Sequence, residues 1–236
     1  MRRLYVSESA LSEIFWDRLF ASSDVAKAKL DAEIIIRETK LIHERFPQDV
    51  AGSISFHAVV SLWLISRYFN PSHVFEVGTF IGRSSLAIIA GSARSLERMD
   101  TCDYSFDQFS LTENLRSTYP NSTLLNYWPK TSSSVALKQL LEAGSAPDMF
   151  FIDGRIAKED LDLMSRLDRK STIYILDDFE GTEKGLENAL ILRRAFPELM
   201  LIRPSLRANG RTNIGILLSP SLITISRQQD LPIFMQ

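Results

Sequence analysis

The chain has 236 residues, 45% of them hydrophobic and 24% charged, which is ordinary for a globular protein with a sizeable core. Its net charge of -2 at pH 7 lacks the basic excess of proteins that bind nucleic acid, so we expect no nucleic-acid partner. No apolar run approaches the roughly 20 residues of a membrane span, the N-terminus does not resemble a signal peptide, and Cys102 is the single cysteine. We therefore expect a soluble, cytoplasmic protein without disulfides or a membrane partner.

The first seventy residues have a helical pattern, in which apolar residues recur at about helical spacing among charged ones. Residues 53–69 form the last helical candidate of this region. It stops at Asn70-Pro71, because a residue before proline is pushed out of the helical conformation. We predict an N-terminal helical extension over residues 1–70 and a second domain over residues 71–236.

From His73 onwards, short apolar runs alternate with amphipathic stretches of helical length. Five predicted strands cover residues 74–77, 98–102, 123–125, 149–152 and 172–176, and the predicted helices cover 84–90, 106–119, 135–143, 158–167 and 183–196. The alternation predicts a doubly wound α/β fold with a parallel sheet between two helical layers. Two further strands, 199–202 and 213–218, have no helix between them and should pair antiparallel as a C-terminal hairpin, which makes seven strands.

The turn after the first predicted strand is the strongest candidate for a binding site. It reads Glu76-Val77-Gly78-Thr79-Phe80-Ile81-Gly82, and ligands of open parallel sheets bind at the carboxyl ends of the strands. The glycines allow a sharp turn and close approach of a ligand, and the free N–H groups of the next helix, with Ser84 and Ser85, suit a carboxylate. The spacing does not match the dinucleotide motif G-x-G-x-x-G. Taken alone, the turn also fits a simple connection between strand and helix.

The longer stretch from His73 to Leu86 resembles the first motif of small-molecule O-methyltransferases related to the catechol and caffeoyl-coenzyme A enzymes. It is more similar still to the branch that contains macrolide-sugar O-methyltransferases and cephalosporin-hydroxylase-like proteins. The resemblance runs from about Ser53 to Leu218. It implies a class I methyltransferase with a Rossmann-like seven-stranded sheet, S-adenosylmethionine as cofactor, and N-terminal helices that form a lid or the interface of a homodimer or higher homo-oligomer.

The resemblance also implies roles for residues of the turn. Gly78, Thr79, Gly82 and Ser84 would hold the methionine part of the cofactor, Glu76 would brace the turn, and Phe80 would contact the cofactor.

Asp103 lies at the end of the second predicted strand, where a carboxylate can accept hydrogen bonds from both ribose hydroxyls. Asp100 sits earlier in this strand and should point elsewhere. Alternatively, Asp103 caps the helix predicted to begin near Phe106. Tyr104 could pack against the adenine ring, although an aromatic residue after a strand can equally belong to the core.

Carboxylates also follow the fourth and fifth predicted strands. Asp153, Asp177 and Asp178 should emerge at the same edge of the sheet, and three carboxylates suit a hard cation such as Mg²⁺ that lowers the pKa of an acceptor hydroxyl. Metal-dependent members of the resembled family carry Asp at the first place and Asp-Asp or Asp-Asn at the second. Alternatively, Asp177 or Asp178 caps the next helix and no metal binds. Asp148 is interpreted as a structural residue at a strand start.

The sequence departs from the resembled family at the position of the general base. The resembled sugar enzymes have a His after Asp-Gly and the catechol enzymes have a Lys three places after the Asp, where this chain has Arg155 and Ile156. We take Asp153 and Lys158 as candidate catalytic residues, although a lysine on a helix is commonly just solvated, and arginine is a poor base. His57 is a further candidate, with a core position as its alternative.

The sequence therefore predicts an S-adenosylmethionine-dependent, Mg²⁺-assisted O-methyltransferase that acts on a small hydroxylated molecule such as a sugar or a natural product. Two alternatives remain open. One is a cofactor-binding partner subunit without transferase activity, and the other is a hydroxylase-like enzyme on the same fold.

Overall fold

The computed structural model describes residues 8–20, 37, 40, 44, 54–92, 95–104, 124–179, 184–204 and 213–225. The helices in these ranges are α1 (Glu8–Phe20), α3 (Phe56–Phe69), α4 (Arg83–Gly91), α6 (Ser133–Glu142), α7 (Lys158–Met164), α8 (Lys184–Ala195) and α9 (Pro220–Ile225). The strands are β1 (His73–Val77), β2 (Arg98–Asp103), β3 (Leu125–Pro129), β4 (Met149–Ile152), β5 (Ile173–Leu176), β6 (Met200–Ile202) and β7 (Gly215–Leu218). The helix predicted over 106–119 lies outside the described residues.

The seven strands form one sheet in the order β3-β2-β1-β4-β5-β7-β6. Strands β1 to β5 are parallel, and β7 runs antiparallel to both of its neighbours, β5 and β6. The predicted doubly wound, seven-stranded α/β fold with an antiparallel C-terminal pair is therefore confirmed.

The third strand was predicted too early in the chain. Residues 123–125 were expected to form it, whereas β3 covers Leu125–Pro129. Asn126 and Pro129 are poor strand formers, but among the described strands β3 pairs only with β2, and polar residues and proline are tolerated on an edge strand. The sequence pattern does not reveal which strand lies at the edge.

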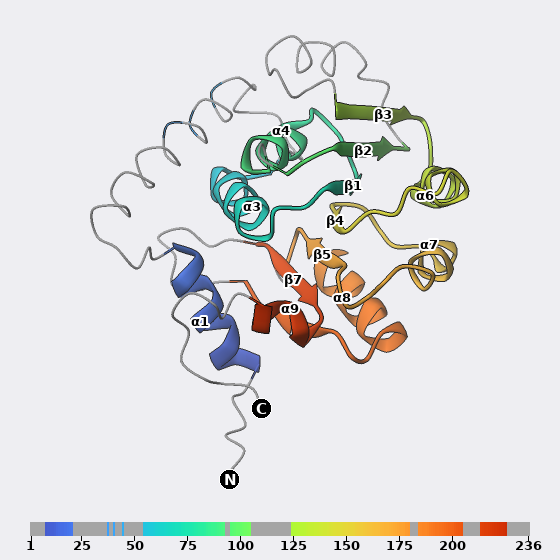
Figure 1. Cartoon of the computed structure of the whole chain (residues 1–236). Coiled ribbons are helices and arrows are strands. Elements are labelled where there is room, and N and C mark those ends of the chain that lie inside the picture. Colours follow the sequence, from blue (N-terminus) through green and yellow to red (C-terminus); the bar gives the residue numbers. More distant parts are fainter. Residues whose placement is uncertain are drawn as a thin grey trace.

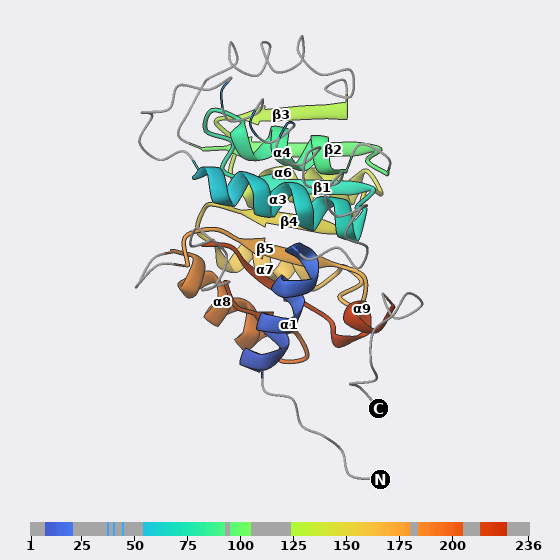
Figure 2. The same ribbon diagram turned by 90° about the vertical axis from the view of Figure 1, so that its left-hand side faces the viewer.

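Helices cover both faces of the sheet (Figures 1 and 2). Side chains alternate along each strand, so Val74 belongs to the core under α1, α3 and α4, while its neighbour Phe75 belongs to the core under α6, α7 and α8. The described part of the N-terminal region contributes to this packing, because Trp16 of α1 is buried and donates from its indole Nε1 to the Arg203 carbonyl over 2.5 Å. None of the helices in the described ranges is long and apolar enough to cross a membrane.

The strand order changes direction beside β1. The chain proceeds from β1 outwards to β2 and β3 and then returns to the other side of β1 to form β4. In register, Val77 lies beside Cys102 on one side and Ile152 on the other. The residues that follow these three strand ends therefore meet at one point, where open α/β sheets bind their ligands.

Candidate functional site

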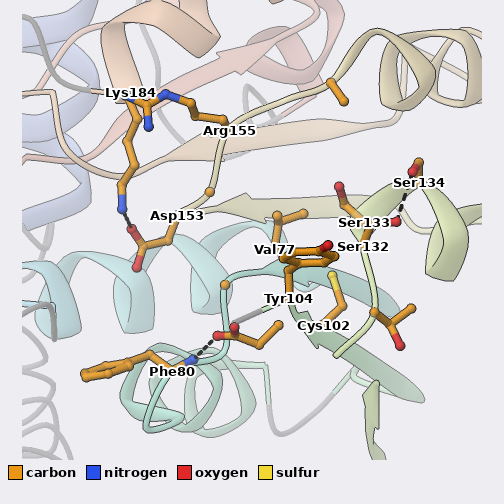
Figure 3. A pocket seen from close by; sticks show the side chains of 15 residues that line it. Val77, Phe80, Cys102, Tyr104, Ser132, Ser133, Ser134, Asp153, Arg155 and Lys184 are labelled. Atoms are coloured by element: carbon orange, nitrogen blue, oxygen red, sulfur yellow. Dashed lines mark hydrogen bonds and ion pairs between the residues drawn. The ribbon is translucent and has the colours of Figure 1, made fainter. Parts of the chain in front are cut away.

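A cavity of about 420 Å³ opens at this point (Figure 3). Its lining comes from the carboxyl ends of β1, β2 and β4 and the turns after them, from residues before and in the first turn of α6, and from the first residue of α8. It consists of Val77, Gly78, Phe80, Cys102, Asp103, Tyr104, Thr131, Ser132, Ser133, Ser134, Asp153, Gly154, Arg155, Ala157 and Lys184. Cavities of roughly 300–1,000 Å³ are typical of small-molecule sites.

The turn after β1 has the backbone that its glycines predict. Gly78 has φ +96° and Gly82, the N-cap of α4, has φ +79°. Phe80 also has a positive φ, of +44°, which an L-residue adopts at some cost. A Cβ on Gly78 would lie 3.4 Å from the backbone carbon and oxygen of Asp153. That is an ordinary van der Waals distance, so the reason for glycine at this place is its positive φ, and the floor of the cavity stays free of a side chain.

Glu76, in β1, braces this turn through hydrogen bonds, as expected. It is fully buried, and its carboxylate accepts hydrogen bonds from Ser84 and Thr101, each over 2.5 Å, and from Ser85. Burial raises the pKa of Glu76 to about 7, although the three hydroxyl groups oppose the rise. The sequence marks Glu76 as the one acidic residue within β1.

Thr79 and Ser84 do not line the main cavity. The Thr79 hydroxyl lies 2.6 Å from that of Thr101, and the Ser84 hydroxyl donates to Glu76. Both residues line a small hollow on the neighbouring side of the turn, together with Asp153. Their predicted contact with the methionine part of a cofactor stays a prediction.

The structure separates the two acidic residues of β2. Asp103 lines the cavity and accepts a hydrogen bond from the Phe80 backbone N–H over 2.9 Å (Figure 3). Asp100 is buried away from the cavity, where it interacts with His73, Arg98 and Trp128. Side chains alternate along a strand, so these residues, three apart, project to opposite faces.

The residues around Asp100 complete a structural network at the opposite end of the strands. The His73 ring lies 2.8 Å from the Asp100 carboxylate, and Asp148 accepts from the backbone N–H of His73 over 3.1 Å. Asp148 therefore has the structural role expected of it, and the structure gives His73 a structural role as well. Tyr104 lines the cavity and is 76% exposed, so it is not part of the core.

The carboxylates after β4 and β5 lie near one another but in different environments. Asp153 lines the cavity, and burial raises its pKa to about 6, opposed by Lys184. Asp177 is buried and does not line the cavity, and burial together with the charges of Asp153 and Asp178 raises its pKa to about 7. Asp178 has φ +54° at the turn that follows β5.

Lys184 joins two of these carboxylates, and sequence reasoning missed it. Its Nζ lies 2.6 Å from Asp153 Oδ1 and 3.0 Å from Asp178 Oδ2. One feature of the sequence could have pointed to Lys184. A lysine as the first residue of a helix is unfavourable beside the positive end of the helix dipole, so an acidic partner nearby is expected. The expected Mg²⁺ ligands therefore do not fit a divalent cation, since an ammonium group already lies between two of them.

The other catalytic candidates lie outside the cavity or at its rim. Lys158 is exposed as the first residue of α7 and does not line the cavity, and His57 is exposed on α3. Arg155 lines the cavity but is largely exposed and pairs with Glu187. The geometry gives none of them the position next to Asp153 that Lys184 has.

Sequence reasoning also missed the serines before and in the first turn of α6. Ser132 caps the helix by accepting from the Val135 N–H over 3.4 Å, and Ser133 donates to the buried Asp160 over 2.9 Å. A serine at the start of a helix predicts a cap, but the fold is needed to bring Ser132, Ser133 and Ser134 to the cavity.

No protein-family model matches the sequence, and a search of curated proteins finds no match either. Among solved structures, the chain is similar to the O-methyltransferase TomG from Streptomyces achromogenes, solved with S-adenosylmethionine, with TM-score 0.57 and 16% identity over 89% of this chain and 96% of that one. It is also similar to the Podospora anserina methyltransferase PaMTH1, solved with S-adenosylhomocysteine, with TM-score 0.55 and 14% identity over 84% of this chain and 97% of that one.

A third similar structure is an O-methyltransferase from Bacillus cereus, solved with S-adenosylhomocysteine, with TM-score 0.53 and 17% identity over 89% of this chain and 98% of that one. At these identities the likeness establishes the fold. The chain has the Rossmann-like fold of class I S-adenosylmethionine-dependent methyltransferases.

Proposed function

We propose that this protein is an S-adenosylmethionine-dependent O-methyltransferase that acts on a small hydroxylated molecule, such as a sugar or a natural product. The observation that carries the proposal is the cavity beside β1, where Gly78, Asp103 and Asp153 meet at the ends of three adjacent strands. Proteins of the same fold were solved with S-adenosylmethionine or S-adenosylhomocysteine bound.

The residues of the cavity fit this cofactor. Gly78 leaves room for a ligand to approach the backbone, since its position carries no Cβ and has a φ that favours glycine. Asp103 is tied to the turn through the Phe80 N–H, and its carboxylate is a suitable acceptor for ribose hydroxyls. Ser132 and Ser133 place hydroxyl and backbone groups of the start of α6 at the cavity wall.

When bound, the cofactor supplies an electrophilic methyl group on a sulfonium, which an acceptor oxygen can take up as an ether. Asp153 lies in the same cavity as Gly78, and its carboxylate is the group we propose for orienting the acceptor hydroxyl and accepting its proton. The buried strand ends around Asp153 limit the access of water. The proposed step needs no Mg²⁺, because Lys184 lies between Asp153 and Asp178.

Calorimetric titration with S-adenosylhomocysteine tests the proposal directly. We expect the wild-type protein to bind it, and Asp103→Asn to weaken binding about tenfold or more, because a hydrogen bond to a charged group contributes about 1.5–3 kcal/mol. Asp162→Asn, an exposed acid of α7 outside the cavity, is the matched control and should bind as the wild type does. Absence of binding to the wild-type protein would overturn the proposal.

Turnover then separates the transferase from the two alternatives. Mass spectrometry of a panel of hydroxylated acceptors should show methylated products that depend on S-adenosylmethionine. Cofactor binding without any transfer would favour the partner-subunit alternative, and oxygenated products would favour the hydroxylase-like one. A homodimer or higher homo-oligomer and a cytoplasmic location belong to the same proposal, and light scattering and cell fractionation test them.

A further inference from the structure

Lys184 is held at the edge of the cavity by the way α8 begins. The next residue, Gly185, donates its backbone N–H to the Asp178 carbonyl over 3.2 Å, and a Cβ on it would lie 1.9 Å from the Asp177 carbonyl oxygen. A residue without a side chain is therefore needed directly after Lys184, so that the first turn of α8 can lie against the turn after β5. The Lys184 side chain extends from this start to Asp153 (Figure 3).

The ammonium group of Lys184 lies between carboxylates from two strand ends, 2.6 Å from Asp153 and 3.0 Å from Asp178. The side chains of Lys184 and Asp153 are 27% and 11% exposed, so water and salt screen this pair less than a surface ion pair. Neighbouring carboxylates repel one another in such surroundings, and the lysine charge offsets that repulsion. The positive charge that offsets the carboxylates at this edge of the sheet therefore comes from a side chain of the protein.

The arrangement differs from a divalent metal site in its donor groups. Mg²⁺ requires near-octahedral oxygen ligands at about 2.0–2.1 Å. Across the residues that the structure describes, no group of three or more His, Cys, Asp or Glu side chains is arranged to hold a metal ion. Asp177, the third acid predicted to bind Mg²⁺, is buried behind the cavity lining. A metal ion here would have to displace an ammonium group that is already paired twice.

We propose that Lys184 takes the place of a divalent cation at this edge of the sheet. It is a positioning residue that holds Asp153 and Asp178 in their observed arrangement, and the chain neither binds nor requires a divalent metal there. The claim about metal binding stands by itself, whereas the claim that methyl transfer needs no metal rests on the proposed function.

Binding of Mn²⁺, measured as the loss of the electron paramagnetic resonance signal of the free ion, tests the first claim without any assay of activity. We expect no saturable Mn²⁺ binding by the wild-type protein or by Lys184→Arg, which keeps the positive charge. Lys184→Met removes the charge at similar length and should create one Mn²⁺ site, which a second substitution, Asp153→Asn, should abolish. Lys138→Met, an exposed lysine of α6, is the matched control and should resemble the wild type.

Two outcomes would overturn the proposal. The first is saturable Mn²⁺ binding by the wild-type protein that Asp153→Asn removes, because the site would then be open to a metal with Lys184 in place. The second is a folded Lys184→Met protein, verified by circular dichroism, that gains no Mn²⁺ site. If Lys184→Met fails to fold, the wild-type and Lys184→Arg titrations still decide the question.

Turnover tests the second claim once an acceptor is found. We expect the wild-type rate to be the same with EDTA as with added Mg²⁺, and Lys184→Arg to retain more of kcat than Lys184→Met at similar affinity for S-adenosylhomocysteine. A rate that EDTA abolishes and Mg²⁺ restores would refute this claim. Failure of the protein to bind S-adenosylhomocysteine would refute the proposed function instead, and the Mn²⁺ results would be unaffected by it.

Discussion

The candidate site at the carboxyl ends of the strands has two halves, which are built in different ways. The turn half consists of residues 76–85 and Asp103, and its contacts link a continuous segment to the next strand. The acid half consists of Asp153, Asp177, Asp178 and Lys184, which come from the ends of β4 and β5 and the start of α8. The turn half is thus encoded locally, whereas the acid half exists only once three separate segments have come together.

This difference has a chemical consequence. In the turn half, the local sequence indicates the local geometry, because the glycines take positive φ angles and the buried acid is bonded to hydroxyl groups of the same segment. In the acid half, the same three carboxylates fit a metal site or a lysine-centred ion pair, and Lys184 decides between the two. An acidic cluster therefore defines a cation site only when the nearest basic side chain is also known.

Gly185→Ala should have the largest effect, because it breaks the assembly of the acid half. The new Cβ would lie 1.9 Å from the Asp177 carbonyl oxygen and 2.7 Å from that of Asp178, so the start of α8 must move. We expect a loss of about 2–3 kcal/mol of stability or more, which lowers the melting temperature by roughly 4–12 °C. Differential scanning calorimetry checks this.

Gly144→Ala is the control for that prediction. A Cβ on Gly144 meets no atom within 4 Å, although its φ is +74°, so only backbone strain of about 1 kcal/mol is expected. Equal losses for the two variants would mean that the close contact of α8 with the turn after β5 does not constrain Lys184.

The same difference, between features set by neighbouring residues and features set by distant segments, explains how far the sequence predicts the fold and the site. β4 is predicted residue for residue at 149–152, because the run of four apolar residues is too short for a helix and is bounded by Asp148 and Asp153. β3 is misplaced because its tolerance of Asn126 and Pro129 depends on its place at the edge of the sheet.

The same limit applies to the site residues. Asp103 could be chosen over Asp100 from the alternation of side chains along one strand. Lys184 could not be paired with Asp153, thirty-one positions earlier, without the fold that brings the two segments together. Ser133 likewise reaches the cavity only through the packing of α6 beside the sheet.

Gly78→Ala should have a smaller effect on stability and a specific effect on binding, which tests the turn half. Its φ of +96° costs an alanine about 1–2 kcal/mol, and the Cβ would meet Asp153 at 3.4 Å. We expect a loss of stability similar to that of Gly144→Ala, together with at least about tenfold weaker binding of S-adenosylhomocysteine, or 1.4 kcal/mol. Gly144→Ala should bind normally, and equal affinities for the two variants would remove Gly78 from the binding site.

Glu76→Gln should change stability in a way that depends on pH. The folded protein holds the Glu76 proton up to a pKa of about 7, whereas the unfolded chain releases it near the ordinary value of 4.5. Between these values the folded state binds more protons, so this group lowers stability as pH rises, by up to about 1.4 kcal/mol per pH unit. Glutamine has no such titration, so the stability of Glu76→Gln relative to the wild type should increase from pH 5 to 7 and level off above.

Urea denaturation at each pH measures this difference. Asp153 and Asp177, whose pKa values are raised to about 6 and about 7, titrate in both proteins, and the charge of Asp153 itself contributes to the raised pKa of Glu76. Glu142→Gln, an exposed acid of α6, should give a flat difference and serves as the control. A flat difference for Glu76→Gln as well would show that its carboxyl is ionised in the folded state at neutral pH. The three hydroxyl donors would then outweigh burial, and the turn half, like the acid half, would contain a charge fixed by its neighbours.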